Sequence, residues 1–233
     1  MKDKSIFTSR AEPIDVTRRK QLFLDDLCVE ETRGLARRLH RPTKCGPIMV
    51  PDSENGETAL QSRNVPQWNA EKGLWEWWYW GYWECEPYGP HQSTTRVMSQ
   101  YAVSEDGLNW RKPVLGRHEW RGSRENNLVM PPEDGNRALY HVIRDENASN
   151  PARRYKGLLG NDDRRPAVSP DGLDWTALDV PAIPSNDESH FCYDDFGGQF
   201  VATVKHGTVW GRSVFLATSG AFEEWRHHGS VLH

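Results

Sequence analysis

Apolar and polar residues alternate over short stretches along most of this chain, and no stretch keeps the period of a long amphipathic helix. Alternation with a period of two residues predicts strands with one buried face. The pattern is clearest in residues 67–80, 142–156 and 192–204, where a polar turn separates two such stretches. Each of these segments is predicted to form a β-hairpin. The 19 Gly and 15 Pro residues supply many turns, which favours an all-β fold of short strands.

A short phrase recurs along the chain. Tyr-Ala-Val-Ser-Glu-Asp-Gly-Leu-Asn-Trp at residues 101–110 returns as Pro-Ala-Val-Ser-Pro-Asp-Gly-Leu-Asp-Trp at residues 166–175, and a degenerate copy occupies residues 216–225. Asp can bond the backbone of its own turn and Gly accepts a positive φ, so the phrase predicts a second hairpin whose Trp packs on the returning strand. One Asp-Gly hairpin is commonplace, but two near-identical copies and a third worn one indicate a repeated unit.

Two hairpins in series predict a four-stranded antiparallel sheet. Three such sheets in a row are typical of the blades of a β-propeller, and we place them near residues 61–116, 120–180 and 183–229. The chain stops directly after the third blade, whereas a propeller needs about 4–8 blades to close. We therefore expect the propeller to be incomplete at the C-terminus, with the chain forming the front part of a longer protein or a second copy completing the unit.

The aromatic run within the first blade bears on both core and ligand. On a strand, Trp75, Trp77 and Tyr79 share one face and Trp78 and Trp80 share the other. Both faces are then buried between blades, so most of these rings are predicted to be core. At most one or two of them are expected to contact a ligand.

Length, charge and motifs limit the remaining alternatives. The 233 residues predict one main domain, a propeller over residues 21–233 beginning with an apolar strand at 21–29, after a polar lead-in at 1–20. A net charge of -4 argues against nucleic-acid and membrane partners. No segment has the apolar core of a signal peptide, so a cytoplasmic location is expected. No metal-ligand spacing occurs, and no metal or other cofactor is expected.

Several phrases together resemble a known group of proteins. They are Gln-Leu-Phe-Leu-Asp-Asp at 21–26, the repeats at 101–110 and 167–175, Arg-Arg-Tyr-Lys-Gly at 153–157, and Gly-Arg-Ser-Val-Phe-Leu-Ala-Thr-Ser at 211–219. The chain resembles bacterial proteins of the five-bladed β-propeller glycoside hydrolase superfamily, the clan of family 32 and family 43, and is most similar to uncharacterised family-32-like proteins. The resemblance implies an all-β, five-bladed propeller fold, of which this chain supplies about three blades.

The resemblance also implies carboxylate chemistry. Enzymes of this clan use an Asp as nucleophile or base, a Glu as general acid and a further Asp that stabilises the transition state, and the separation of the carboxyl groups decides retention or inversion. The invertase signature Asn-Asp-Pro-Asn-Gly is absent, and residues 61–65 at its place contain no carboxylate. Glu188 is the preferred acid, with Asp187 close behind; on an extended chain the two face opposite ways, so only one points at a substrate. A solvated loop is the alternative for both.

The other candidates each carry an alternative. Asp145 beside Arg144 is a candidate transition-state stabiliser, or it opens the turn that ends at Pro151. Asp26 is a candidate nucleophile, or with Asp25 it bonds backbone groups. The candidate substrate-binding residues are Arg63 and Asn64, which clamp a substrate or pair with a neighbouring blade, together with Arg144 and His190.

Three functions from different classes follow. The leading hypothesis is a glycoside hydrolase that cleaves an oligosaccharide or polysaccharide without a redox cofactor. The second is a weakly active or inactive propeller that binds carbohydrate, which the missing first-blade Asp favours. The third is a protein-interaction platform, which requires an axial funnel lined by apolar residues.

Overall fold

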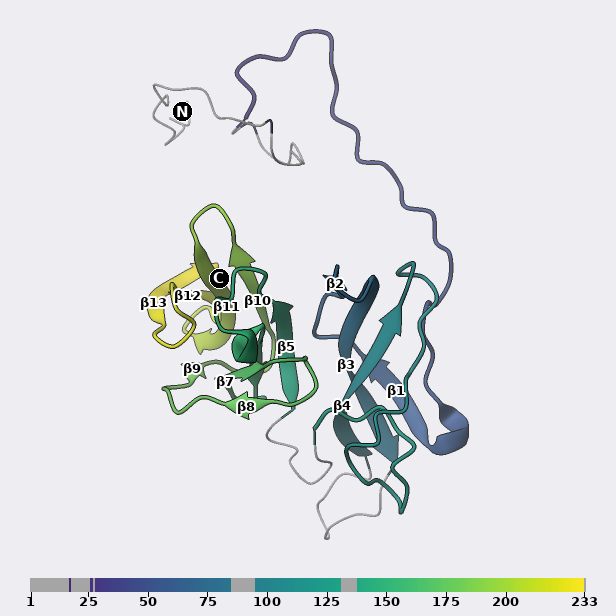
Figure 1. Cartoon of the computed structure of the whole chain (residues 1–233). Coiled ribbons are helices and arrows are strands. Elements are labelled where there is room, and N and C mark those ends of the chain that lie inside the picture. Colours follow the sequence, from purple (N-terminus) through teal and green to yellow (C-terminus); the bar gives the residue numbers. More distant parts are fainter. Residues whose placement is uncertain (1–16, 18–25, 27, 85–94, 131–137, 233) are drawn as a thin grey trace. The chain divides into compact units, whose positions relative to one another are not determined.

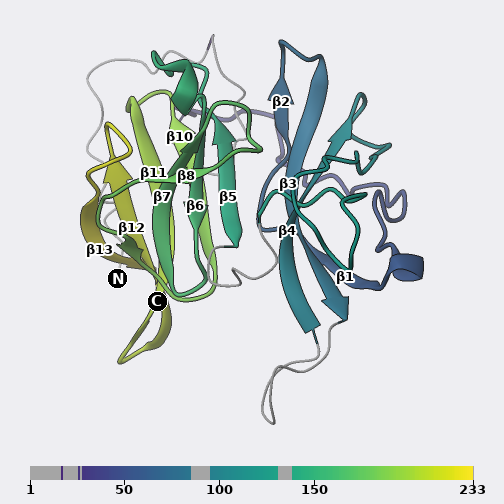
Figure 2. The ribbon, with the colours of Figure 1, turned by 60° about the horizontal axis from the view of Figure 1, so that its bottom comes forward.

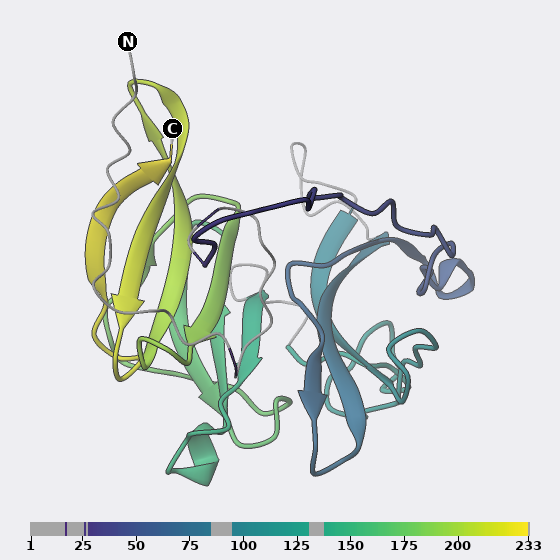
Figure 3. The same cartoon turned by 90° about the horizontal axis from the view of Figure 1, so that it is seen from above.

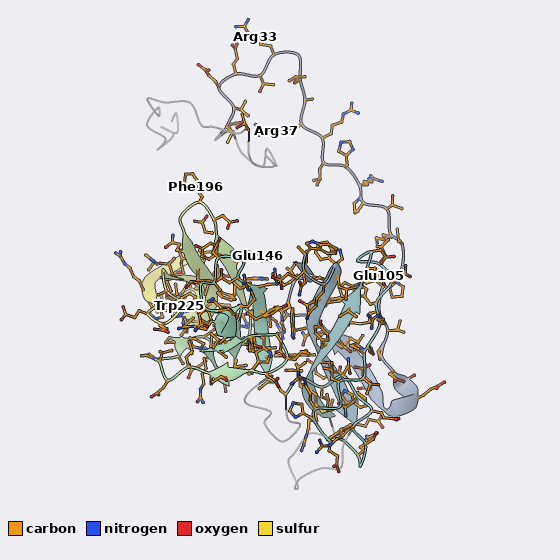
Figure 4. The ribbon with its side chains drawn as sticks, in the orientation of Figure 1. Arg33, Arg37, Glu105, Glu146, Phe196 and Trp225 are labelled. Carbon is orange, nitrogen blue, oxygen red and sulfur yellow. The ribbon has the colours of Figure 1, made fainter. Side chains whose placement is uncertain are left out.

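The computed structural model describes residues 17, 26, 28–84, 95–130 and 138–232. The chain divides into two units, Met1–Cys45 and Gly46–His233. In the described part of the first unit, residues 28–45 are mostly exposed and form no regular strand. Its ion pairs are Arg33 with Glu31 and Arg37 with Asp26, and both arginines are labelled in Figure 4. The strand predicted at 21–29 falls largely outside the described residues.

The second unit contains three antiparallel sheets (Figure 1). In the first sheet the central strand β3 pairs with β4 along one edge and with both β1 and β2 along the other. The hairpin predicted at 67–80 is the β2–β3 pair, closed by a turn with Gly73 at φ 62°. The strands are β1 (Glu57–Gln61), β2 (Gln67–Asn69), β3 (Leu74–Glu84) and β4 (Thr95–Ser104).

The second and third sheets have their strands in chain order, apart from the short strand β9, which pairs with β7. The second contains β5 (Leu139–Arg144), β6 (Tyr155–Leu159), β7 (Asp163–Ser169), β8 (Thr176–Ala177) and β9 (Ile183–Pro184). The third contains β10 (Ser189–Asp194), β11 (Gln199–Thr208), β12 (Gly211–Ser219) and β13 (Arg226–Leu232). Among the described residues, helical structure is limited to two single 3-10 turns, Ser53–Asn55 and Pro151–Arg153. The predicted series of four-stranded units is thus confirmed in its essentials.

The recurring phrase forms the same turn in all three sheets. Each copy ends its strand with a buried Ser whose hydroxyl accepts a hydrogen bond from the backbone N–H three residues on, and each Trp indole donates to the carbonyl of that same residue. The residue in question is Gly107 at φ 75°, Gly172 at φ 80° and Phe222 at φ 69°. In the third copy a Phe therefore adopts the left-handed conformation that the first two reserve for Gly.

The core lies between neighbouring sheets, and β5 contacts β2 and β3 of the first sheet and β10 of the third (Figure 2). One apolar cluster joins the first and second sheets around Trp78, Leu139 and Tyr155. A second cluster joins the second and third sheets around Leu158 and Phe222. Figure 3 shows the three sheets from above, with the first sheet in blue and the last strands of the third in yellow. Sheets that face one another through apolar clusters are the arrangement predicted for blades.

A buried carboxylate also crosses the first of these interfaces. Glu76 on β3 is fully buried, and its oxygens accept hydrogen bonds from Tyr101 at 2.6 Å and from Tyr155, on β6 of the next sheet, at 2.6 Å. Asn69 at 3.0 Å and Lys72 at 2.7 Å complete the set. Burial opposes ionisation of Glu76, but these four bonds outweigh it and lower the pKa of the carboxyl group.

Candidate functional site

The start of β5 lies where side chains from all three sheets converge. Tyr140 and His141 are the second and third residues of β5 and are almost fully buried. Arg63, from the connection between β1 and β2, lies with its guanidinium 5.3 Å from the ring centre of Tyr140. The residues just before β10, Asp187 and Glu188, form ion pairs with the same guanidinium. We call this group, with Arg164, Ser189, His190 and Lys205, the axial cluster.

Arg63 is the hub of the axial cluster. Its side chain is only 12% exposed, and it also lies 5.3 Å from the ring of Trp80. Nη1 pairs with Glu188, and Nη2 lies 3.5 Å from Oδ1 of Asp187. Burial alone lowers the pKa of Arg63, but the hydrogen bond to Glu188 and the surrounding charges outweigh it and raise the pKa. The guanidinium is thus a fixed positive charge at this position.

Asp187 has a backbone conformation that the sequence did not predict. Its φ is 47°, in the left-handed region, and its carbonyl accepts hydrogen bonds from the Tyr140 hydroxyl and from Arg164. Because the chain is not extended here, the expectation that Asp187 and Glu188 face opposite ways is wrong: both carboxylates contact Arg63. The hydrogen bond from Lys205 Nζ, at 2.6 Å, together with its charge, lowers the pKa of Asp187. Asp187 is therefore ionised at neutral pH.

Behind the two carboxylates lies a chain of buried polar groups. Arg164 Nε donates to Ser189 Oγ at 2.7 Å, and Ser189 Oγ lies 2.8 Å from Nε2 of His141. Since the Ser189 oxygen accepts from Arg164, its proton is available to His141, whose ring also hydrogen-bonds the Arg63 backbone. Burial, and then the charge of Arg164, lowers the pKa of His141 to about 3. His141 is therefore neutral and holds the start of β5 against β10.

The remaining substrate-binding candidates near this point differ in exposure. Asn64 donates to the Trp78 carbonyl at 3.2 Å and accepts from the Val142 N–H at 2.6 Å. Asn64 thus joins the first sheet to β5, so it has the contacts of a residue that pairs with a neighbouring blade, the alternative to binding substrate. His190 is exposed on β10, and its ring centre lies 6.2 Å from that of His141 in a stacked arrangement. His190 is available to a ligand approaching the axial cluster.

Arg144 and Asp145 lie at the other end of β5. Arg144 stands four positions after Tyr140 on β5, a distance of roughly 13 Å along the strand. Arg144 pairs with Glu71 at 2.9 Å and with Glu146, which stands in the loop after β5 (Figure 4). Asp145 pairs with Lys156 Nζ at 2.5 Å, and both side chains are buried. The structure therefore does not bring these two candidates together with Glu188, and Asp145 has the contacts of a residue that opens a turn.

Asp26 belongs to the first unit of the chain, where it pairs with Arg37. Its neighbour Asp25 lies outside the described residues. The catalytic role predicted for Asp26 thus stays a prediction.

Sequence reasoning missed five members of the axial cluster: Tyr140, His141, Arg164, Ser189 and Lys205. One carried a usable signal, since His141 is a polar residue within the otherwise apolar strand β5, and such a position requires a partner. Arg164 and Ser189 stand among polar residues, where the sequence does not mark a buried group. Tyr140 and Lys205 carried no signal. An aromatic residue on a strand usually belongs to the core, and a lysine on a strand usually lies at the surface.

The described residues form neither a metal-binding group nor a membrane-spanning helix. No group of His, Cys, Asp or Glu side chains in that part of the chain is arranged to hold a metal ion. No helix there is long and apolar enough to cross a membrane.

Comparison with known proteins supports the fold. No family model matches the sequence, and no curated protein sequence matches it significantly. The structure is similar to a β-fructofuranosidase from Schwanniomyces occidentalis complexed with fructosyl-erythritol, with 15% identity, a TM-score of 0.54, and coverage of 79% of this chain and 35% of that one. It is less similar to sucrose-6-phosphate hydrolase from Lactobacillus gasseri, with 15% identity, a TM-score of 0.44, and coverage of 74% and 34%.

A further comparison is the β-fructofuranosidase BmSUC1 of Bombyx mori, in a mutant form complexed with sucrose, with 12% identity, a TM-score of 0.43, and coverage of 71% and 36%. The chain spans about a third of the length of each of these three proteins. The likeness to the first establishes the fold class: an all-β fold of the five-bladed propeller type, of which this chain supplies about three blades.

Proposed function

We propose that the axial cluster cleaves glycosidic bonds of an oligosaccharide or polysaccharide. The observation that carries this proposal is the convergence of Asp187 and Glu188 on Arg63, beside the start of β5. Paired carboxylates that differ in environment are the usual equipment of glycosidases. The structural likeness to a β-fructofuranosidase supports the same class of reaction through the fold alone.

The two carboxyl groups have different surroundings, which suggests a division of roles. Asp187 has a lowered pKa and bonds Lys205, so it suits the part of the ionised group. Glu188 has one cationic partner and a side chain that is 58% exposed, so it is the more accessible to a glycosidic oxygen. In the proposed step a sugar hydroxyl takes the place of Glu188 on Arg63, and Glu188, protonated from solvent as its ion pair opens, gives that proton to the leaving oxygen as the C–O bond breaks. Water adds to the anomeric carbon and loses its proton to a carboxylate.

Arg63 and His190 are proposed to position the sugar. The Arg63 guanidinium has five N–H donors in a fixed plane, and those not used by the carboxylates can bond substrate hydroxyls. His190 is exposed beside the cluster and can bond hydroxyl groups through either ring nitrogen.

The test compares Glu188→Gln with a matched control on a panel of aryl glycosides and oligosaccharides. Glu146 is the control, because its side chain is also 58% exposed and also pairs with a buried arginine, at the far end of β5. We expect kcat to fall by roughly a hundredfold to ten-thousandfold in Glu188→Gln and in Asp187→Asn, and to stay near wild type in Glu146→Gln. Equal losses at Glu188 and Glu146, or no loss at Glu188, would contradict the assignment.

One observation favours a second function, a propeller that binds carbohydrate with little or no catalysis. Both carboxylates of the axial cluster are paired with cations, and the first two sheets contribute Arg63, Tyr140 and His141 rather than further carboxylates. If no substrate of the panel is cleaved but a glycan still binds, and Arg63→Gln weakens that binding, this alternative replaces the first. If nothing is cleaved and nothing binds, both functions fail.

A further inference from the structure

A second candidate site lies away from the axial cluster, on the first sheet. The connection after β4 folds back over this sheet, where Leu128 bridges to Gln100 and a tight turn closes between Trp120 and Ser123. A cavity of about 370 Å³ lies between the connection and the strands β1, β3 and β4. None of the residues that line it belongs to the axial cluster.

Four buried polar atoms on the wall of this cavity have no hydrogen-bond partner in the described part of the chain. Two are acceptors, Glu57 Oε1 and Gln100 Oε1, and two are donors, the indole Nε1 atoms of Trp83 and Trp120. Glu57 and Gln100 are at most 1% exposed, and Trp83 is 7% exposed. Buried polar groups are nearly always paired, because an unpaired one has lost its hydrogen bonds to water without replacing them. Four such atoms around one cavity indicate that they serve something inside it.

The orientation of Gln100 is fixed by its neighbours. Asn127 Nδ2 donates to the Tyr79 hydroxyl at 2.9 Å and to the Tyr101 carbonyl at 2.8 Å, so its Oδ1 is the atom that accepts from Gln100 Nε2. Gln100 Oε1 is thus the acceptor left over, and it lies beside Glu57 Oε1: the two oxygens are 2.0 and 2.6 Å from the position that a Cβ on Gly81 would take. Neither oxygen has a donor among the described residues.

We propose that this cavity binds one ring of a neutral sugar. A cation satisfies only the two carbonyl-type oxygens and an anion satisfies only the two indole N–H groups. A hydroxyl group both donates and accepts, so a polyhydroxylated ring serves all four atoms. The other oxygen of Glu57 already pairs with Lys112 Nζ at 2.5 Å, which offsets its charge. The volume falls at the small end of the usual range of ligand pockets, roughly 300–1,000 Å³, as one ring requires.

Two indole rings border the proposed site, and the guanidinium groups of Arg96 and Arg121 each lie 5.7 Å from the ring centre of Trp120. Trp83 and Trp120 lie edge to face with ring centres 6.4 Å apart, and both line the cavity. Tryptophan offers a large apolar surface with a polar edge, which suits the apolar C–H face and hydroxyl rim of a sugar ring. The proposal rests on this cavity alone and is independent of the activity proposed for the axial cluster.

The experiment is saturation-transfer NMR on the full chain with methyl glycosides of common hexoses and with fructose as probes. Trp120→Phe keeps the ring and removes one donor, and Gln100→Met removes one acceptor. The controls are Trp68→Phe, which changes an exposed indole outside the cavity, and Glu188→Gln in the axial cluster. Thermal unfolding of each variant verifies its fold.

We expect saturable binding of at least one probe, at least tenfold weaker in both Trp120→Phe and Gln100→Met and unchanged in the two controls. Binding that only Glu188→Gln abolishes belongs to the axial cluster and overturns this proposal while supporting the other. No binding by any probe, or binding that is indifferent to both cavity variants, also overturns it. Preference for a charged analogue over the neutral sugar overturns the ligand class.

Discussion

The two interfaces between the three sheets are filled differently at an equivalent position. At the first interface the large side chain comes from a strand, and at the second it comes from a turn. At the first interface, Trp78 of β3 reaches the turn of the next sheet, donates to the Gly172 carbonyl at 2.6 Å and occupies the space that a Cβ on Gly172 would need. At the second interface the strand position that corresponds to Trp78 is Leu158, since each pairs with the first residue of its repeat. The shorter Leu158 is accompanied by Phe222, which is fully buried in the turn of the third sheet.

The difference shows that the conformation of the turn depends on hydrogen bonds to the backbone that all three copies share. The residue that fits at its positive-φ position depends on the side chains of the neighbouring sheet. A large ring from the preceding strand demands Gly in the turn, and a small residue there leaves room for Phe. Phe222 therefore tolerates a φ of 69°, because its burial offsets the backbone cost of about 1–2 kcal/mol for a left-handed residue with a Cβ.

The largest effect is expected from Phe222→Ala. The substitution keeps the left-handed strain but empties the space among Phe191, Phe200 and Trp225, whose rings Phe222 contacts, and truncating a buried Phe costs about 3–5 kcal/mol. Urea unfolding monitored by tryptophan fluorescence measures the loss. Phe222→Gly is the companion variant, and it should lose about 1 kcal/mol less because glycine relieves the strain. Equal losses would show that the strain is absent.

The next effect separates backbone strain from packing. Gly172→Ala meets both a positive φ and the ring of Trp78, and we expect a loss of about 3 kcal/mol in the free energy of unfolding. Gly107→Ala is its matched control, because it has the same turn and a similar φ but its nearest neighbour lies at 3.7 Å. The control should lose about 1 kcal/mol. If the two variants lose the same amount, the proposed competition between Gly172 and Trp78 is wrong.

The polar groups of the two interfaces differ in their response to acid. At the second interface His141 has a pKa of about 3, below its ordinary 6.5, so the unfolded chain binds the proton first and stability falls as pH falls below 6.5. The slope approaches about 1.4 kcal/mol per pH unit below pH 6.5, which gives a loss of about 2 kcal/mol between pH 6.5 and 4.5. At the first interface the contribution of Glu76, whose pKa is lowered from 4.5, is lost only at more acidic pH.

Unfolding by urea at several pH values between 4.5 and 7 measures this slope, and His141→Gln should flatten it. Hydrogen exchange resolves where the change occurs: protection should fall first in β5 and β10. An unchanged slope in His141→Gln would place the acid sensitivity elsewhere.

The smallest effect concerns the acid within the turn. Asp171 accepts from the N–H groups of Leu173 and Asp174, each at 2.8 Å, whereas the third copy has Ala221 at this place and forms the turn without it. Asp171→Ala should therefore lose only about 1 kcal/mol and keep the sheet intact. Equilibrium unfolding and circular dichroism measure the two parts of this expectation. Loss of the hairpin in this variant would mean that the third copy forms its turn without an Asp only because Phe222 stabilises it.

The sequence predicted the parts of this molecule that depend on local chemistry. Asp171 and Gly172 carry the turn in their own conformational preferences, and the alternation of residues 67–80 specifies the β2–β3 hairpin. It also predicted that both faces of β3 are covered: Trp78 and Tyr79 are buried on opposite faces, while Trp75 is half-buried. Local patterns suffice where the nearest neighbours along the chain decide the outcome.

The rest depended on contacts between distant residues. The φ of Asp187 is held by Tyr140 and Arg164, which lie on another sheet, so no local pattern reveals that both carboxylates face Arg63. The same is true of Phe222, whose apolar cluster includes Leu158, a residue remote in sequence. The role proposed for Asp145 relied on its neighbour Arg144, and the register of β5 takes both to the end of the strand away from the axial cluster.

The large side chain is supplied by the strand residue Trp78 at the first interface and by the turn residue Phe222 at the second. This difference has a consequence for how the sequence can change in evolution. A blade copied or transplanted as a unit brings its own strand residue and its own turn residue, and each must match a neighbour that has not moved. Placing the third turn beside Trp78 would set a phenyl ring against an indole, and placing the second beside Leu158 would leave a void. The part of this molecule that must be kept together is thus the interface between two blades. A change in the strand residue of one blade requires a matching change in the turn residue of the next.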